Sequence, residues 1–236
     1  GVSGIEGAFN EQLTDKATRG QPFMVSLDSR VQGVLESELT TAVTNLEALG
    51  GAGIILDVHN GEVLAMSSLP TYNPNKFSGS SMASRRNAMT HNLYELGSTF
   101  KPLTVAAGID AGTITSMARK YDATQPLAIA GFRLRDSHAA GRWLNVPETL
   151  MQSSNITTAR IADELGRENM EHMFRNLKFN ARPEIDIKER AFPLWPRQWG
   201  RLTTLTTGFG HGIAVTPLHL ANAYAAMVNG GIYRPA

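Results

Sequence analysis

The apolar positions of this chain follow two spacings, one typical of amphipathic helices and one typical of strands. The longest helical pattern covers residues 31–49, where apolar side chains recur every three or four positions. The spacing of Ser29 and Gln32 predicts a capping box at the start of this helix. A short apolar run at residues 23–27 predicts a strand that precedes it.

Two further apolar runs occupy residues 53–58 and 62–67. The sequence between them, His59-Asn60-Gly61, contains an Asn-Gly pair, which favours the positive φ angles of a tight hairpin turn. A helix followed by an antiparallel hairpin predicts the α+β class, with an antiparallel sheet flanked by helices.

A second helical pattern follows residues 69–93, which are rich in Pro, Asn, Ser and Gly and predict a long loop. Ser98 is placed to cap this helix, Pro102 lies in its first turn, and Gly112 ends it. Residues three apart share a helix face, so we expect the Lys101 amine to reach the Ser98 hydroxyl.

A serine beside a lysine is a pair that nucleophilic catalysis uses. The hydroxyl becomes reactive when a neighbouring base takes its proton, and an amine is a base only in its neutral form. Burial and the positive end of a helix both lower the pKa of a lysine. On this local pattern alone, a capping serine next to a solvated lysine is an open alternative.

A junction between two later helices carries a second group of polar residues. Asn145 and Glu148 are spaced as a capping box for the first helix, and residues 156–165 form the next helical run. Ser153 and Asn155 lie between the two, where they must face either solvent or a cleft. Simple helix capping explains them equally well.

The glycine-rich residues 208–212 precede a helix that Thr216-Pro217 opens. Their spacing differs from the Gly-x-Gly-x-x-Gly of dinucleotide-binding loops, which argues against a phosphate site. At the other end of the chain, residues 1–22 are predicted to be a linker or the remnant of an N-terminal non-catalytic region. Residues 23–236 are predicted to form one main domain.

Composition excludes several classes of function. The 236 residues are 42% apolar and carry a formal charge of +1, so nothing favours nucleic acid or an anionic surface as a partner. Cysteine is absent, which excludes disulfides and thiolate ligands, and the six histidines lack ligand-like spacing. We expect no metal and no cofactor. No apolar run approaches the roughly 20 residues that span a bilayer.

Ser98-Thr99-Phe100-Lys101 and Ser153-Ser154-Asn155 resemble the first two motifs of the serine penicillin-recognising enzymes. The surrounding sequence is similar to class B penicillin-binding proteins of the cell-division type, which are monofunctional peptidoglycan D,D-transpeptidases. This similarity extends over nearly the whole chain, through the stretches Leu56 to Met66, Pro70 to Asn75, Tyr94 to Ser98 and Gly208 to Leu220.

The resemblance implies roles for four residues. Ser98 would be the acylated nucleophile, with its backbone N–H as one oxyanion donor, and Lys101 would be the base. Ser153 would relay the proton, and Asn155 would bind an amide of the donor stem peptide. The implied partners are peptidoglycan stem peptides, β-lactams and cell-division proteins. The implied location is the periplasmic face of the inner membrane, anchored by an N-terminal helix not present here, with no membrane contact from these residues.

The sequence departs from the family pattern in two respects and leaves two alternatives. The stretch between Glu6 and Ser26 and the loop at Ser80 to Arg85 are shorter than is usual in the family. The sequence also contains no Lys-Thr-Gly or Lys-Ser-Gly triplet, so we expect a transpeptidase domain truncated before its third motif and impaired in activity. One alternative is a serine β-lactamase; class D enzymes carry Ser-x-Val at the second motif, and Glu189 does not fit the class A Glu-x-x-Leu-Asn loop. The other is a non-catalytic module with the same fold, which would need none of the four residues.

Overall fold

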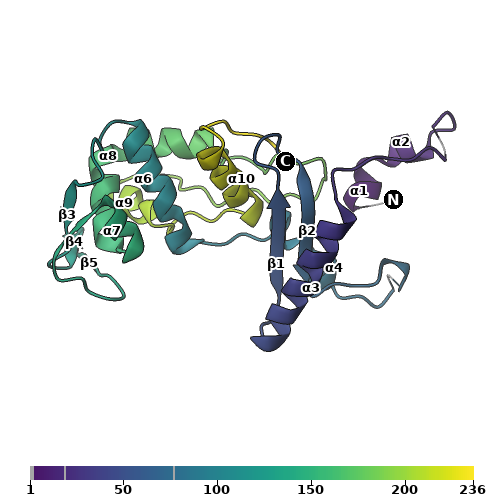
Figure 1. The fold of residues 1–236 in the computed structure, drawn as a ribbon, viewed down its shortest axis with the longest axis horizontal. Coiled ribbons are helices and arrows are strands. Elements are labelled where there is room, and N and C mark those ends of the chain that lie inside the picture. Colours follow the sequence, from purple (N-terminus) through teal and green to yellow (C-terminus); the bar gives the residue numbers. More distant parts are fainter. Residues whose placement is uncertain (1–2, 19, 77) are drawn as a thin grey trace. The chain divides into compact units, whose positions relative to one another are not determined.

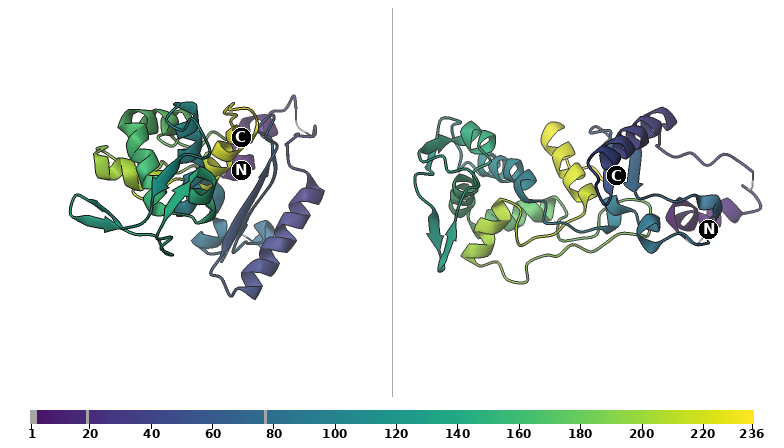
Figure 2. Two further views of the ribbon diagram at one scale, coloured as in Figure 1. Left: turned by 60° about the vertical axis from the view of Figure 1, so that its left-hand side comes forward. Right: turned by 90° about the horizontal axis from the view of Figure 1, so that it is seen from below.

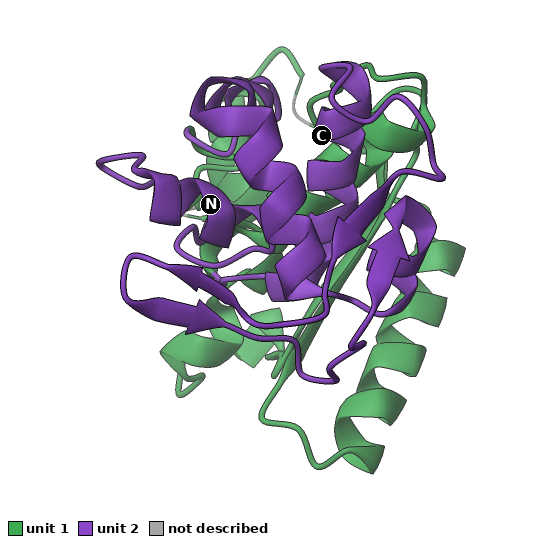
Figure 3. Cartoon of the chain, turned by 90° about the vertical axis from the view of Figure 1, so that its left-hand side faces the viewer, with its two compact units in different colours: residues 1–93, 181–192, 216–236 green, residues 94–180, 193–215 purple. Residues whose placement is uncertain are grey.

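The computed structural model describes residues 3–18, 20–76 and 78–236. The chain divides into two compact units (Figure 3). Unit 1 comprises residues 1–93, 181–192 and 216–236, and unit 2 comprises residues 94–180 and 193–215. The predicted boundary between a linker and a main domain at residue 22 stays a prediction.

The centre of unit 1 is an antiparallel hairpin on which a long helix packs. Strand β1 (Gly51–Leu56) pairs with β2 (Val63–Leu69), and helix α3 (Ser29–Asn45) lies along them (Figure 1). Two glycines of β1 allow this close packing. A Cβ added to Gly53 would lie 2.8 Å from the Leu35 side chain, and one added to Gly51 would lie 2.9 Å from the Val43 side chain. The hairpin and the helix confirm the sequence prediction.

The turn of the hairpin differs from the predicted Asn-Gly type. The chain returns from Asp57 to Glu62, closed by a 2.9 Å hydrogen bond from the Asp57 N–H to the Glu62 carbonyl. Gly61 has φ +88°, whereas Asn60 does not adopt a positive φ. The Asn60 side chain instead accepts a hydrogen bond from the Glu62 N–H, 2.9 Å away. A longer loop thus replaces the two-residue turn.

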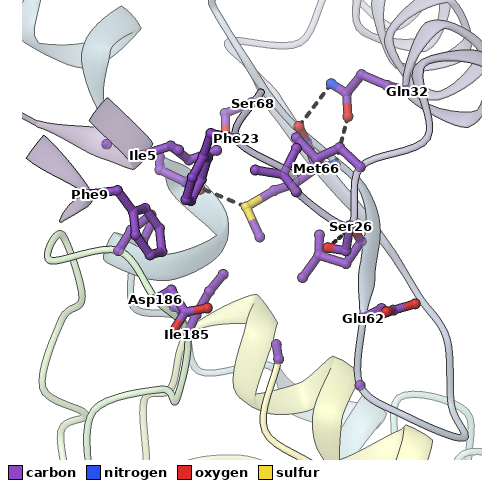
Figure 4. Close-up of a pocket in the computed structure, with 18 of the residues that line it drawn as sticks. Ile5, Phe9, Phe23, Ser26, Gln32, Glu62, Met66, Ser68, Ile185 and Asp186 are labelled. Carbon is purple, nitrogen blue, oxygen red and sulfur yellow. Dashed lines mark hydrogen bonds between the residues drawn. The ribbon is translucent and has the colours of Figure 1, made fainter. Parts of the chain in front are cut away.

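The start of α3 also differs from the prediction. Asp28 caps the helix by accepting hydrogen bonds from the N–H groups of Arg30 and Val31. Gln32 bonds elsewhere: its side-chain amide accepts from the Met66 N–H at 2.9 Å and donates to the Met66 carbonyl at 3.0 Å (Figure 4). Residues 23–27 do not form the predicted strand. The Met66 backbone groups of β2 bond to this side-chain amide instead.

We predict that Gln32→Met lowers the free energy of unfolding by about 1–3 kcal/mol. The substitution keeps the side-chain length but leaves the Met66 N–H and carbonyl without their partner on an edge strand. Urea unfolding measures the change, and size-exclusion chromatography shows whether the freed edge promotes association. Gln12→Met, in the exposed helix α2, is the control. Equal stability of the Gln32 variant and the wild type would contradict this role of the amide.

The remaining helices of unit 1 are short except for the last. They are α1 (Gly4–Ala8), α2 (Asn10–Thr14), η1 (Pro74–Lys76), α4 (Met82–Arg85), α5 (Ala88–His91) and α10 (Pro217–Val228). Helix α10 confirms the predicted start at Thr216-Pro217, and it has a capping box formed by Thr216 and His219. Both α5 and α10 contact β1.

Unit 2 is mainly helical and contains two small antiparallel ribbons (Figure 2). Its helices are η2 (Gly97–Phe100), α6 (Lys101–Asp110), α7 (Val146–Met151), α8 (Asn155–Asn176) and α9 (Arg201–Gly208). The ribbons pair β3 (Lys120–Asp122) with β6 (Trp143–Asn145) and β4 (Leu127–Ile129) with β5 (Phe132–Leu134). The sequence prediction missed these strands and α9. The helical run predicted for residues 156–165 continues in α8 beyond a break at Gly166, where φ is +79°.

An aromatic cluster anchors η2 to the core of unit 2. The ring centroid of Phe100 lies 5.7 Å from that of Phe174 in α8 and 5.3 Å from that of Phe179. All three side chains are completely buried. Because Phe100 follows Ser98 by two residues, this packing fixes the backbone on which the predicted nucleophile stands.

Candidate active site

Ser98 stands exposed on η2, immediately before α6 begins. A close contact between two backbone segments holds it there. The Gly97 N–H donates to the Gly210 carbonyl at 3.2 Å, and a Cβ added to Gly210 would lie only 2.2 Å from the Gly97 carbonyl oxygen. The glycines at residues 208–212 therefore permit close approach of the chain to the serine turn.

Two further interactions join the same segments. Tyr94 and Val215 exchange backbone hydrogen bonds of 3.0 and 3.1 Å. The Glu95 carboxylate accepts from the Gly212 N–H at 2.8 Å. The residues just before Ser98 are thus held at three points. Sequence reasoning did not find this function of the glycine-rich stretch, because it depends on pairing between distant segments.

The predicted capping role of Ser98 is wrong. Neither η2 nor α6 has a side-chain cap, although Pro102 does occupy the first turn of α6 as predicted. Within residues 3–18, 20–76 and 78–236, no hydrogen bond joins the Ser98 hydroxyl to the Lys101 amine. The lysine makes its hydrogen bonds to another serine.

Lys101 is the buried cation of unit 2, with only 2% of the residue exposed. Its amine donates to the Ser153 hydroxyl at 2.9 Å and also to the Ser153 carbonyl oxygen. Burial lowers the pKa of Lys101 to about 8, and the negative charge of Asp136 opposes part of this shift. Near neutral pH this amine gives up its proton far more readily than an exposed lysine does.

Ser153 occupies the junction between α7 and α8 in a strained backbone conformation. Its φ is +50°, in the left-handed region that non-glycine residues seldom adopt. The helix cap at this junction is Ser154, whose hydroxyl accepts from the Thr157 N–H at 3.1 Å. Capping therefore does not explain Ser153. Its left-handed backbone conformation instead places the hydroxyl and the carbonyl oxygen where both accept hydrogen bonds from Lys101.

We predict that Ser153→Gly is about 0.5–1 kcal/mol more stable than Ser153→Ala. Both variants lose the hydroxyl, so their difference isolates the backbone, where glycine relieves the positive φ at the cost of greater freedom when unfolded. Urea unfolding measures it. The same pair of substitutions at Ser84, inside α4, should show the opposite order. An alanine variant at 153 that is as stable as the glycine variant would contradict strain at this position.

Asn155 is the first residue of α8, and its side-chain amide donates to the Arg135 carbonyl at 3.2 Å. Asp136, the next residue in that loop, accepts from the Ser154 hydroxyl at 2.7 Å and from the Ile156 N–H at 3.0 Å. Sequence reasoning missed Asp136, since it belongs to no motif and lies 18 residues from its serine partner.

Unit 2 therefore brings together Lys101 and Ser153 by direct contact, with Ser98 one turn before the lysine and Asn155 two residues after the second serine. The described residues contain no cluster of three His, Asp or Glu side chains that could hold a metal ion. A cavity of about 600 Å³ lies in unit 1, lined by Phe9, Phe23 and Met66 among others (Figure 4). It contains none of the four predicted site residues.

These features define an α+β protein in which a buried lysine contacts one serine and follows a second, exposed serine by one turn. Residues 51–236 match the model of the penicillin binding protein transpeptidase domain, and the chain belongs to this family. The domain of Burkholderia pseudomallei penicillin-binding protein 3 shares the fold, with a TM-score of 0.79 and 26% identity over 92% of this chain and 61% of that one. The predicted fold class is thereby confirmed.

Curated relatives named FtsI match the entire chain. The "Probable peptidoglycan D,D-transpeptidase FtsI" of Caulobacter vibrioides is 39% identical, and the "Peptidoglycan D,D-transpeptidase FtsI" of Escherichia coli K12 is 32% identical. The chain spans 40% of the length of the first protein and 44% of the second. A solved structure titled as a peptidoglycan glycosyltransferase from Burkholderia ambifaria matches with a TM-score of 0.80 and 28% identity, over 90% of this chain and 63% of that one. Within the described residues, no helix is long and apolar enough to cross a bilayer.

Proposed function

We propose that this chain carries the acyl-transfer site of a peptidoglycan D,D-transpeptidase that cross-links stem peptides and is acylated by β-lactams. The family and the names of the two FtsI relatives support this activity. The observation that carries it is the buried Lys101 amine in contact with Ser153, one turn after an exposed serine. A module without catalysis would gain nothing from burying that cation, because an unpaired buried charge is costly.

In the first half-reaction, the Ser98 hydroxyl oxygen attacks the carbonyl carbon of the penultimate D-alanine of a donor stem peptide. Lys101 accepts the hydroxyl proton as the new ester bond forms. The backbone N–H of Ser98 stabilises the charge that develops on the carbonyl oxygen. The peptide bond to the terminal D-alanine then breaks, and Ser153 passes the proton from Lys101 to the leaving nitrogen. Asn155 binds a side-chain amide of the donor.

In the second half-reaction, an amine of another stem peptide attacks the ester carbonyl. The amine loses a proton, the bond to the Ser98 oxygen breaks, and Ser98 recovers its hydroxyl proton. A β-lactam enters the same path, but its leaving nitrogen stays tethered to the acyl group. The resulting adduct is long-lived, because no amine acceptor displaces it.

The proposed substrate also indicates where the protein is located, and the names of the relatives indicate its partners. Peptidoglycan cross-linking takes place outside the cytoplasmic membrane, so we assign the site to the periplasmic face of the inner membrane. The FtsI name of both relatives supports cell-division proteins as partners.

Incubation of the complete protein with a fluorescent penicillin, followed by intact-mass and peptide mass spectrometry, tests the proposed function. We expect one stable adduct, on the peptide that contains Ser98. Rapid turnover of the penicillin without a lasting adduct would indicate a β-lactamase instead. Absence of both an adduct and turnover would indicate a non-catalytic module.

A further inference from the structure

Asp136 links the loop after β5 to the junction that presents Ser153 and Asn155. Its two carboxylate oxygens accept from different donors, the Ser154 hydroxyl at 2.7 Å and the Ile156 N–H at 3.0 Å. Its neighbour Arg135 accepts from the Asn155 amide through the backbone carbonyl at 3.2 Å. Two successive loop residues thus hold three successive residues of the junction.

This attachment is well suited to a junction that carries strain. Ser153 keeps a left-handed φ of +50°, a conformation that persists only where surrounding contacts enforce it. The carboxylate lies at the start of α8, where a negative charge also interacts favourably with the exposed N–H groups of the first turn. Removing it would free the junction at the point where the chain turns toward Lys101.

The same carboxylate acts on Lys101 through its charge. Burial is the larger influence and lowers the pKa of Lys101 to about 8, while Asp136 raises that pKa. Among the described residues, the groups that face the amine are the hydroxyl and carbonyl oxygen of Ser153, and Asp136 supplies the charge. Asp136 therefore stabilises the junction and, at the same time, favours the protonated lysine.

We propose that Asp136 is a positioning residue for acylation of Ser98, which holds the Ser153–Asn155 junction against Lys101 through its hydrogen bonds to Ser154 and Ile156 and through its negative charge. This inference rests on the proposed function. It assigns the residue two separable effects, one through hydrogen bonds and one through charge. Asp136→Asn removes the charge and keeps an acceptor oxygen, whereas Asp136→Ala removes the charge and both acceptors.

The test is the second-order rate of penicillin acylation, measured in the complete protein between pH 6 and 10. For Asp136→Asn we expect the rise of the rate with pH to move to lower pH by about half a unit or more, because the neutral lysine forms more easily without the carboxylate. For Asp136→Ala we expect the same shift and, in addition, a plateau lower by at least about tenfold, because the junction loses its attachment.

Asp163→Asn is the matched control, since Asp163 on α8 is paired with Arg201 on α9 and does not act on the Lys101 pKa. Its profile should follow that of the wild type. An unshifted profile for Asp136→Asn would overturn the inference, even if Asp136→Ala loses activity through misfolding. A plateau for folded Asp136→Ala equal to that of the wild type would overturn it as well. If the wild type itself is not acylated, the proposed function fails. This outcome differs from the two results that would overturn the role of Asp136, because in those the wild type is acylated.

Discussion

Ser98→Ala is expected to abolish covalent attachment of penicillin while leaving the protein folded. The hydroxyl oxygen is the atom that would form the ester, and within residues 3–18, 20–76 and 78–236 no other serine stands one turn before a buried lysine. Among the described residues, the Ser98 side chain makes no hydrogen bond and is exposed, so its loss should change stability by at most about 0.5 kcal/mol. Intact-mass spectrometry after incubation with penicillin measures the adduct, and urea unfolding measures the stability.

Ser81→Ala is the control for this experiment. Ser81 caps the short helix α4 in unit 1 and lies outside the candidate site. The control variant should be labelled as fully as the wild type. An adduct that persists in Ser98→Ala, or that maps to a different serine in the wild type, would exclude Ser98 as the nucleophile.

Local cap chemistry was predicted correctly at the starts of two helices, α7 and α10. Asn145 and Glu148 form the predicted capping box at the start of α7, and Thr216-Pro217 begins α10. In each case the donors and acceptors lie within four residues of one another. The pattern in the sequence is therefore enough to predict these bonds.

Predictions failed where a distant partner decides the structure. Gln32 has the spacing of a capping residue for α3, yet its amide bonds to Met66, 34 residues away. Residues 23–27 do not form the predicted strand, and Ser26 instead donates its hydroxyl to the Val63 carbonyl of β2 at 2.8 Å. The strands of unit 2 were missed for another reason: each of β3, β4, β5 and β6 has only three residues, too few to show an alternating pattern.

In the candidate site, too, the sequence predicted the residues but not the contact that depends on distant parts of the chain. Motif spacing identified Ser98, Lys101, Ser153 and Asn155 as candidates, and the structure places the lysine against the second serine. Helical spacing instead suggested contact between Lys101 and Ser98, because it considers only neighbours along one helix. That Lys101 contacts Ser153 depends on the packing of α6 against α8, which no local pattern contains.

Lys101→Met is expected to lower the rate of penicillin acylation by about 10²–10⁴-fold, the usual contribution of a general base. Lys101→Arg should lose a comparable amount, although it retains the positive charge, because a guanidinium does not release its proton at working pH. Stopped-flow measurement of acylation in the complete protein decides the matter. If the arginine variant acylates within about tenfold of the wild type, Lys101 acts through its charge or hydrogen bonds and is not the base.

The same buried amine predicts how stability depends on pH. The pKa of Lys101 is about 8 in the folded protein and 10.5 in its ordinary state, so between these values the unfolded chain binds more protons than the folded one. The free energy of unfolding should therefore rise as pH increases from about 8 to 10.5, by at most about 3 kcal/mol. Lys101→Met should remove this rise, whereas Lys16→Met, at an exposed position, should keep it. Urea unfolding at a series of pH values compares the three proteins. A rise that persists in Lys101→Met would show that other groups cause it. It would also contradict a lowered pKa of Lys101 in the folded protein.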